Sequence, residues 1–460
     1  MTQYITLIDF ILFPFIFLII WRIAVVLRNK HFSRGHILRP YFIPALLLKI
    51  IGSVAFAAVY QFYYGYGDTF GYYNMGNFFT QILKDNPLDF LTIYFTGGDA
   101  YFLPKSYVYN FDYLYNHHIA TIIVSRFSSF IGLITFGNYL LITVGFSILS
   151  FSGLWKLFRL FATLYPAIVK QLAWCILFVP SVIFWGSGLL KDSITLGAIG
   201  WLTFACWSLF FLKKRIKASI LIIIITIWTL IQIKAYILLS FLPGLLIWVG
   251  ALYYKKIQNK QLQILMWPFF ILILSFIAIQ ASGLIAKENK ALSLEEITTT
   301  ALGTGATLQQ YDAGSTYDLG IKSASFGAIL VNSPLAVITT LFRPFVWEVK
   351  NVVMLFSALE SFGILILTAL MLFKTGLLKA IKITFSKSIV FFCFIFAIVF
   401  SIGVALSSGN FGTLVRYKLP AMPFYLVFLL LLYYYGNLMK GREIKGVRRK
   451  KTSLATLAAS

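Results

Sequence analysis

The chain has few charged residues, and fewer of these are acidic than basic. Only 12% of its 460 residues are charged and only 15 are Asp or Glu, whereas a soluble domain carries about 25% charged residues. Hydrophobic residues make up 60%, and the mean hydropathy is +0.85. Continuous apolar runs of about 20 residues, enough to cross a bilayer, recur along the chain. This composition excludes a soluble domain and predicts an all-α, polytopic membrane protein.

Cysteine and histidine are also scarce. Cys175, Cys206 and Cys393 all lie inside apolar runs, which is typical of small core residues. His117 and His118 have no companions at a metal-ligand spacing. Neither a disulfide framework nor a structural metal site is therefore predicted.

Basic residues are abundant, with a formal net charge of +24. They form short clusters between apolar runs, such as 28–39 and 440–451, which is a membrane-orientation signal and predicts no nucleic acid partner. The clusters are expected in the cytoplasm, with the N-terminus outside and the C-terminus inside a bacterial inner (plasma) membrane. About eleven transmembrane helices fit between them, at 5–27, 41–62, 134–155, 168–187, 193–212, 218–233, 236–253, 262–282, 350–373, 387–406 and 420–438.

We expect residues 1–460 to form a single integral membrane domain with two long extracytoplasmic loops. The first, 63–132, contains SRFSSFIGLITF, an apolar stretch that predicts an interfacial helix. The second, 281–347, is rich in Gly, Thr, Ala and Ser, which favours a mobile lid. Thirteen of the fifteen acids fall in outer segments or at outer helix ends, so polar chemistry is expected on the outer face.

The stretch GYGDTFGYY places Asp68 just beyond the second span. A carboxylate there could act as general base toward a sugar hydroxyl, or could hold a divalent cation. Tyr72 and Tyr73 could stack on a sugar ring. The alternative is that Asp68 caps a helix and that the tyrosines form an aromatic belt at the interface.

Later outer turns carry cations. In FWGSGLLKDSITL, Lys191 could bind a phosphate beside a helix N-terminus. The alternative is a snorkelling Lys191 paired with a helix-capping Asp192. Both residues are predicted to bind substrate.

Two further outer segments carry the remaining candidates for substrate binding. In TLFRPFVWEVKN these are Arg343 and Glu348, which could instead form a structural pair. In GTLVRYKLPAMPF they are Arg416 and Lys418, which oppose the prevailing charge rule. Arg416 could clamp a phosphate bidentately, or could bond to lipid headgroups and loop carbonyls. Glu360 is the candidate ionisable residue deep inside a span.

With acids, cations and aromatic residues at the outer ends of its apolar spans, the chain resembles the polytopic glycosyltransferases of the GT-C superfamily. The resemblance is architectural and is carried by GDTFGYY and the many-helix bundle. It implies transfer of a sugar from a polyprenyl-phosphate-linked donor to a glycan or lipid acceptor. It also implies that Asp68 is the catalytic base or a ligand of Mg²⁺ or Mn²⁺, although the paired acids usual in that family are absent.

Two other functions remain open. An O-antigen-type polymerase or ligase is similar in helix number and in using arginines on large outer loops, a role that Arg343 and Arg416 would carry. A transporter of a lipid-linked saccharide would need charged residues along a transmembrane path, for which Glu360 is the candidate.

Overall fold

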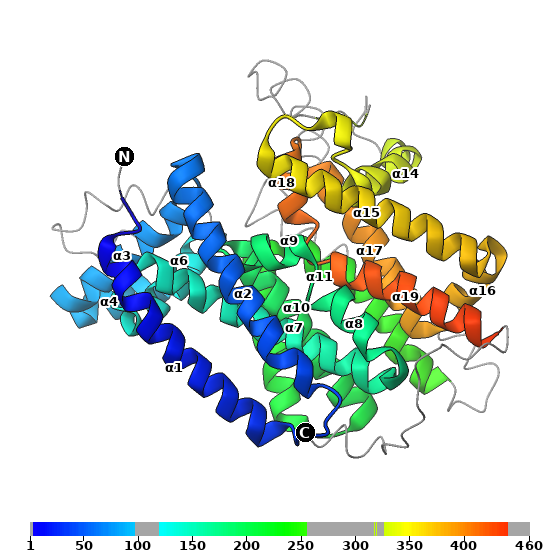
Figure 1. Cartoon of the computed structure of the whole chain (residues 1–460), viewed down its shortest axis with the longest axis horizontal. Helices are drawn as coiled ribbons and strands as arrows, with labels where there is room; N and C mark the ends of the chain where they lie inside the picture. The colour runs from blue at the N-terminus through cyan, green and yellow to red at the C-terminus, as the bar shows by residue number, and fades with distance from the viewer. Residues whose placement is uncertain (1–2, 97–118, 255–316, 318, 320–325, 440–460) are drawn as a thin grey trace. The chain divides into compact units, whose positions relative to one another are not determined.

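The structure is a computed structural model that describes residues 3–96, 119–254, 317, 319 and 326–439 (Figure 1). Every element within these ranges is a helix and none is a strand. The prediction of an all-α chain is therefore confirmed for the part of the chain that the structure describes. His117, His118 and the predicted span at 262–282 lie outside the described residues, as does most of the predicted lid.

The helices are α1 Leu7–His31, α2 Arg39–Val59, η1 Tyr60–Tyr64, α3 Asp68–Asp85, α4 Pro87–Thr96, α6 Ile119–Ile134, α7 Tyr139–Leu164, η4 Pro166–Ile168, α8 Val169–Ile176, α9 Pro180–Phe184, η5 Trp185–Ser187, α10 Lys191–Trp207, η6 Ser208–Leu212, α11 Ile216–Tyr254, α14 Phe326–Phe342, η8 Val346–Glu348, α15 Val352–Thr375, α16 Leu377–Ser386, α17 Ser388–Ser407, α18 Phe411–Tyr417 and α19 Met422–Leu438.

Seven helical segments in the described ranges are long and apolar enough to cross a membrane, or up to nine if each of two bent pairs is one span. The bent pairs are Pro166–Ile176 with Pro180–Ser187, and Phe411–Tyr417 with Met422–Leu438. These helices indicate an integral membrane protein. The count of about eleven spans and the orientation of the termini stay predictions.

The chain divides into two compact units. Unit 1 contains Met1–Leu209 and Arg215–Lys234, and unit 2 contains Phe210–Lys214 and the described residues from Ala235 onward. The long helix α11 is shared between the units. Its backbone is non-helical at Lys234 (φ −152°, ψ 75°), where two helices meet at a kink. The break predicted between the spans 218–233 and 236–253 is therefore present.

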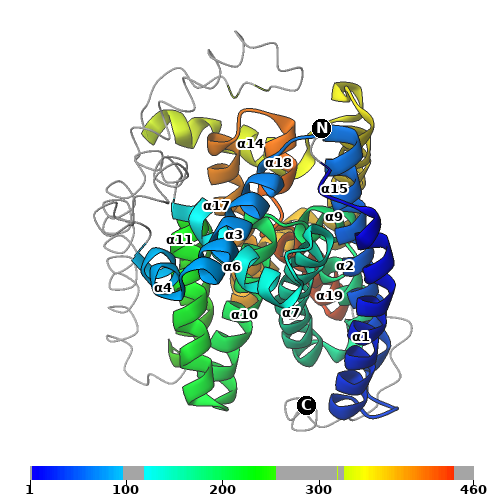
Figure 2. The ribbon, with the colours of Figure 1, turned by 90° about the vertical axis from the view of Figure 1, so that its left-hand side faces the viewer.

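The core of unit 1 forms where α7 packs against α2 and α10, and α1 runs alongside α2 (Figure 2). The α7–α10 contact depends on glycine. A Cβ on Gly153 would lie 1.9 Å from the carbonyl oxygen of Gly197, and one on Gly200 would lie 2.2 Å from that of Gly153. Small residues let helix backbones approach closely in a membrane, where apolar side chains alone give little drive to associate.

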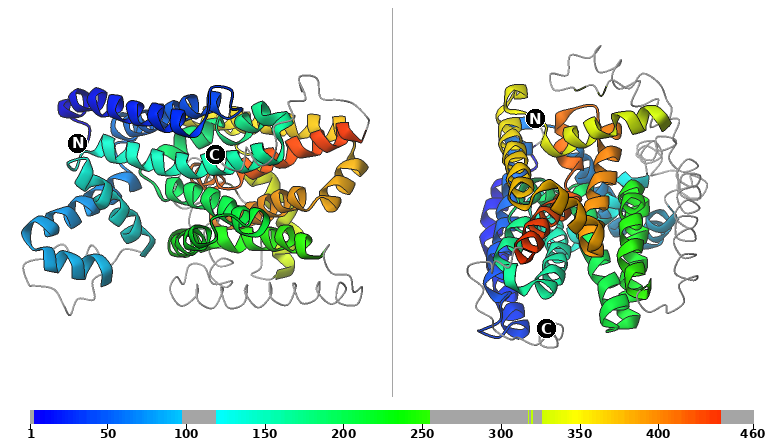
Figure 3. Two further views of the ribbon diagram at one scale, coloured as in Figure 1. Left: turned by 90° about the horizontal axis from the view of Figure 1, so that it is seen from below. Right: turned by 90° about the vertical axis from the view of Figure 1, so that its right-hand side faces the viewer.

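Aromatic rings build much of the core of unit 2. Phe241, in the second half of α11, lies 5.1 Å from Phe392 of α17 between ring centroids and 6.2 Å from Phe424 of α19. Helix α15 packs along α19, and the short α16 contacts α15, α17 and α19 (Figure 3). The described part of unit 2 is therefore a bundle of long helices, with the shorter helices α16 and α18 packed against them.

The start predicted for one span was wrong. The span placed at 134–155 is helix α7, which begins at Tyr139 because Phe136 and Gly137 adopt positive φ and the Asn138 side chain accepts a bond from the Leu141 amide at 2.9 Å. The segment 326–342 lies in the predicted lid but forms the apolar helix α14, despite Pro334 inside it.

The predicted interfacial helix in the first loop corresponds to α6, a 16-residue apolar helix. Most of the rest of the described loop is helical as well, in η1, α3 and α4. Met75 and Phe79 of α3 pack against Ile122 of α6 in a small apolar core.

Candidate functional site

The turn before Asp68 is built by glycine. Helix α2 continues into the π-helical turn η1, and the Gly65 amide then donates to the Tyr60 carbonyl at 2.8 Å. Gly65 (φ 72°) and Gly67 (φ 143°) adopt conformations that favour glycine, and a Cβ on Gly67 would lie 2.5 Å from the Tyr60 ring. Asp68 then begins α3 with an exposed side chain. The amides of a helix N-terminus stabilise a carboxylate there.

Tyr72 lies one helical turn after Asp68 and is buried. The Lys191 ammonium lies 5.9 Å from the centroid of its ring, close enough for a cation–π contact. Lys191 is itself the first residue of α10. The structure therefore brings the starts of α3 and α10 together through Tyr72 and Lys191, with Asp68 one turn away.

Tyr73 has different neighbours from Tyr72. Its hydroxyl donates to the Gly137 carbonyl at 2.9 Å, and its ring packs edge-on against Tyr4 and Tyr139. Burial raises the pKa of Tyr73, so its hydroxyl remains a donor at neutral pH. These contacts join the first residues of the chain to α3 and α7.

Asp192 is fully buried, and its carboxylate pairs with Lys234. The Lys234 Nζ lies 2.5 Å from Asp192 Oδ1. The sequence alternative paired Asp192 with its neighbour Lys191, and that pairing stays a prediction. The ion pair with Lys234, 42 positions away at the break in α11, was not predicted. The Asp192–Lys234 pair ties the start of α10 to that break.

Lys49 was missed by sequence reasoning. It lies inside α2, is 1% exposed, and donates to the carbonyls of Val182 (3.0 Å) and Gly186 (2.5 Å). These carbonyls belong to the turn formed by α9 and η5, which leads to Lys191. The available signal was a single cation in the apolar run PALLLKIIGSVAF, because an ionisable residue inside a span is a functional candidate.

In unit 2, Arg343 and Glu348 form the structural pair that the sequence alternative predicted. Arg343 Nε donates to the two carboxylate oxygens of Glu348 at 2.9 and 3.1 Å, and its Nη2 donates as well. The Phe345 amide donates to Glu348 Oε2 at 2.7 Å. The guanidinium carbon lies 4.9 Å from the centroid of the Phe411 ring. This short loop is therefore closed on itself by charge-assisted bonds.

Lys418 is 1% exposed and lies beside this loop. Its ammonium donates to Ser361 Oγ at 2.9 Å and to the Arg343 carbonyl at 3.4 Å. Arg416 lies two positions earlier, in the last turn of α18. Arg343, Glu348 and Lys418 are thus brought together within unit 2, and Arg416 lies on the adjoining turn.

Tyr317 is a second residue that sequence reasoning missed. Its hydroxyl lies within hydrogen-bond distance of the carbonyls of Ala405 (3.1 Å) and Ser408, and the guanidinium carbon of Arg343 lies 5.7 Å from its ring centroid. Burial raises the pKa of Tyr317 to about 12, although the bond with Ser408 lowers it. Nothing in the surrounding polar stretch distinguishes this tyrosine before the fold is known.

No group of three or more His, Cys, Asp or Glu side chains in the described ranges could hold a metal ion. Asp68 is the residue predicted to bind Mg²⁺ or Mn²⁺, and that assignment stays a prediction. The chain matches no family model, no curated protein and no solved structure.

Proposed function

We propose that the protein is a membrane glycosyltransferase that moves a sugar from a polyprenyl-phosphate-linked donor to a glycan or lipid acceptor on the extracytoplasmic face. The observation that carries this proposal is the grouping in unit 1 of an exposed acid, an aromatic ring and a cation. Asp68 begins α3, Tyr72 follows one turn later, and Lys191 lies against the Tyr72 ring.

In this reaction Asp68 takes the proton of the acceptor hydroxyl as its oxygen attacks the anomeric carbon of the donor sugar. The bond between that carbon and the phosphate oxygen breaks, and the lipid phosphate leaves. Asp68 suits the role of base because it is exposed and stands after an apolar span, where a lipid headgroup would meet water.

Lys191 is the cation proposed to bind phosphate in unit 1. An ammonium at the first residue of a helix, beside backbone amides, favours an anion. Asp192 contributes indirectly, because its ion pair with Lys234 holds the start of α10. We assign Tyr72 a positioning role, since its ring is buried.

In unit 2 we propose Arg416 and Lys418 as residues that attract anionic substrate. Arg343 is less suited to the mobile role that a polymerase or ligase would require, because Glu348 and the Phe411 ring already occupy its guanidinium. The polymerase or ligase is therefore the weaker proposal for this chain.

A transporter of a lipid-linked saccharide is the second candidate, and Lys49 favours it. An ionisable side chain buried within an apolar span marks transport paths in many membrane proteins. Its two carbonyl bonds also suit a purely structural role, in which the lysine fixes the turn at Gly186. The experiment below separates catalysis from transport.

The test is a glycan profile of membranes from a deletion strain, complemented with wild type, Asp68→Asn or Asp85→Asn. Asp85 is the matched control, because it is an exposed acid at the other end of α3. We expect the deletion strain to accumulate a truncated lipid-linked glycan, which wild type and Asp85→Asn clear. Loss of a general base slows turnover by about 10²–10⁴-fold. We therefore expect the truncated glycan to persist with Asp68→Asn, even when this variant is as abundant in the membrane as wild type.

Full rescue by Asp68→Asn would refute the base assignment. If the accumulated glycan is then complete but remains on the inner face, the transporter becomes the better proposal. A deletion strain with an unchanged glycan profile would refute both.

A further inference from the structure

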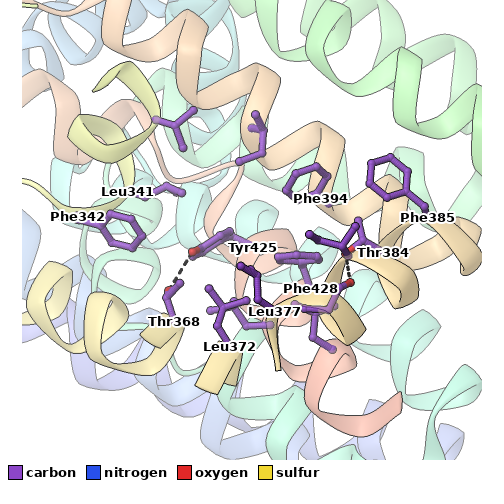
Figure 4. Close-up of a pocket in the computed structure, with 16 residues that line it drawn as sticks. Leu341, Phe342, Thr368, Leu372, Leu377, Thr384, Phe385, Phe394, Tyr425 and Phe428 are labelled. Carbon is purple, nitrogen blue, oxygen red and sulfur yellow. Dashed lines mark hydrogen bonds between the residues drawn. The ribbon is translucent and has the colours of Figure 1, made fainter. Parts of the chain in front are cut away.

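Unit 2 contains a cavity of about 310 Å³, lined by α14, α15, α16, α17 and α19 (Figure 4). Thirteen of its sixteen lining residues are apolar. The polar groups are already engaged, since Thr368 Oγ1 and the Tyr425 hydroxyl lie 2.9 Å apart and Thr384 Oγ1 donates to the Ala380 carbonyl at 2.8 Å. The cavity wall is thus mostly apolar side chains, and its polar groups already have hydrogen-bond partners. Such a wall suits an aliphatic chain rather than a sugar or an ion.

The short helix α16 closes one side of this cavity. Residues 377, 380, 381, 384 and 385 line it, and this spacing marks one face of a helix. At the rim, Leu377 is 64% and Phe385 69% exposed. Exposed apolar side chains around an apolar opening indicate that the cavity faces a hydrocarbon phase.

Exposed lysines lie on the segments that flank the cavity residues of α15 and α16. Lys374 ends α15, Lys379 and Lys382 occupy the other face of α16, and Lys387 joins α16 to α17. The Lys374 and Lys387 ammonium groups lie 5.8 Å and 5.2 Å from the rings of Tyr433 and Tyr435, one and three positions after the cavity residue Leu432. No acidic residue occurs between Glu360 and Glu443.

We propose that this cavity binds one acyl chain of an anionic phospholipid whose phosphate lies among these lysines. An amphipathic helix with lysines on its polar face lies in the plane of the interface, with its apolar face against the acyl chains. Several lysines at one membrane surface attract anionic headgroups. The volume fits part of one chain, so the second chain stays in the surrounding bilayer.

This lipid is not the proposed sugar donor. Thr368 and Leu372 line the cavity, whereas Ser361, which bonds to Lys418, lies two turns nearer the start of α15. Lys374 lies at the end of that helix, about 33 Å from its first residue at 1.5 Å per residue, and the other lysines follow it in sequence. That distance matches the hydrocarbon thickness of a bilayer, about 30 Å. The acyl site therefore belongs to the leaflet at the lysine-bearing end.

The test is photo-crosslinking of the full chain in lipid nanodiscs. Phosphatidylglycerol and phosphatidylcholine carry the same diazirine-labelled acyl chain, and adducts are mapped by mass spectrometry. We expect adducts on the α16 and α19 cavity residues, with phosphatidylglycerol favoured by about fivefold or more. Lys374→Gln with Lys387→Gln should reduce phosphatidylglycerol labelling toward the phosphatidylcholine level.

Ala380→Phe should abolish the cavity adducts by filling the space. Leu378→Phe is the matched control, because residue 378 is exposed on the same helix and does not line the cavity. If Ala380→Phe does not fold, Leu377→Trp narrows the opening from its exposed rim. Equal labelling by the two lipids, or cavity adducts that survive in a folded filling variant, would overturn the proposal.

Discussion

Two buried lysines, Lys234 of unit 1 and Lys418 of unit 2, are held in different ways. In unit 1, Lys234 meets the carboxylate of Asp192 at 2.5 Å. In unit 2, Lys418 donates its hydrogen bonds to neutral oxygens, those of Ser361 and of the Arg343 carbonyl, while the Glu360 carboxylate acts on it electrostatically. Both side chains are almost inaccessible, so the difference lies in the partner rather than in burial.

This difference indicates which charged side chains in each unit are available to act on a substrate. A buried carboxylate that neutralises a buried lysine is committed to structure, which leaves exposed Asp68 as the acid suited to chemistry near α10. The charge of Lys418 is opposed by the Glu360 carboxylate, but that carboxylate does not bond to it among the contacts described, so its charge is less directly compensated than that of Lys234. Unit 1 thus suits proton abstraction, and unit 2 suits attraction of an anion. Both assignments stay predictions.

The largest effect is expected from Asp192→Asn, which leaves Lys234 buried without its counter-ion. Removing one partner of a buried ion pair destabilises a protein by about 3–5 kcal/mol. We expect a large fall in the thermal midpoint of the detergent-purified protein and in its monodisperse yield. Asp85→Asn is the control, because it neutralises an exposed acid at the C-terminal end of α3 and should leave both values unchanged.

The double variant Asp192→Asn with Lys234→Met sharpens the same test. Removing both charges is often close to neutral for stability, since no uncompensated charge remains. The double variant should therefore recover most of the loss. If Asp192→Asn alone is as stable as wild type, the comparison fails. Lys234 would then not need the Asp192 carboxylate, just as Lys418 has no carboxylate bonded to it in the part of the chain that the structure describes.

A smaller effect is expected from Lys49→Met. Lys49 resembles Lys418 in that its bonds go to neutral oxygens, yet it belongs to unit 1. The carbonyls of Val182 and Gly186 would lose a donor, at a cost of about 1–3 kcal/mol. The measurement is again the thermal midpoint, with exposed Lys30→Met as the control. An unchanged midpoint with lost function would instead favour the transporter.

Long apolar runs could be located from the sequence, while their capped ends could not. The spans expected at 350–373 and 387–406 are α15 and α17, displaced by at most two residues. Their hydrophobic length is enough to locate such helices from the sequence. The start of α7 depends instead on the positive φ angles at residues 136 and 137 and on the Asn138 cap, which hydropathy does not register.

The site was predictable only where its contacts are local. The Arg343–Glu348 pair spans five positions and follows from a short loop, and the exposure of Asp68 follows from its place after an apolar run. Asp192 and Lys234 are 42 positions apart, and Lys418 and Ser361 are 57 apart. Such pairs arise from helix packing, so single-sequence patterns could not identify Lys234 as a partner of Asp192.

The smallest effect is expected from Ser361→Ala, the unit 2 counterpart of Asp192→Asn. Ser361 Oγ accepts from Lys418 and donates to the Arg343 carbonyl at 3.2 Å. Losing such a hydrogen bond costs about 0.5–1.5 kcal/mol, and Lys418 keeps the Arg343 carbonyl as a partner. Ser357→Ala, one turn earlier on α15, is the matched control, because its hydroxyl bonds only to its own helix among the contacts described. If Ser361→Ala lowers the thermal midpoint as far as Asp192→Asn does, then a hydroxyl is as necessary to a buried lysine as a carboxylate, and the two units do not differ in the way proposed.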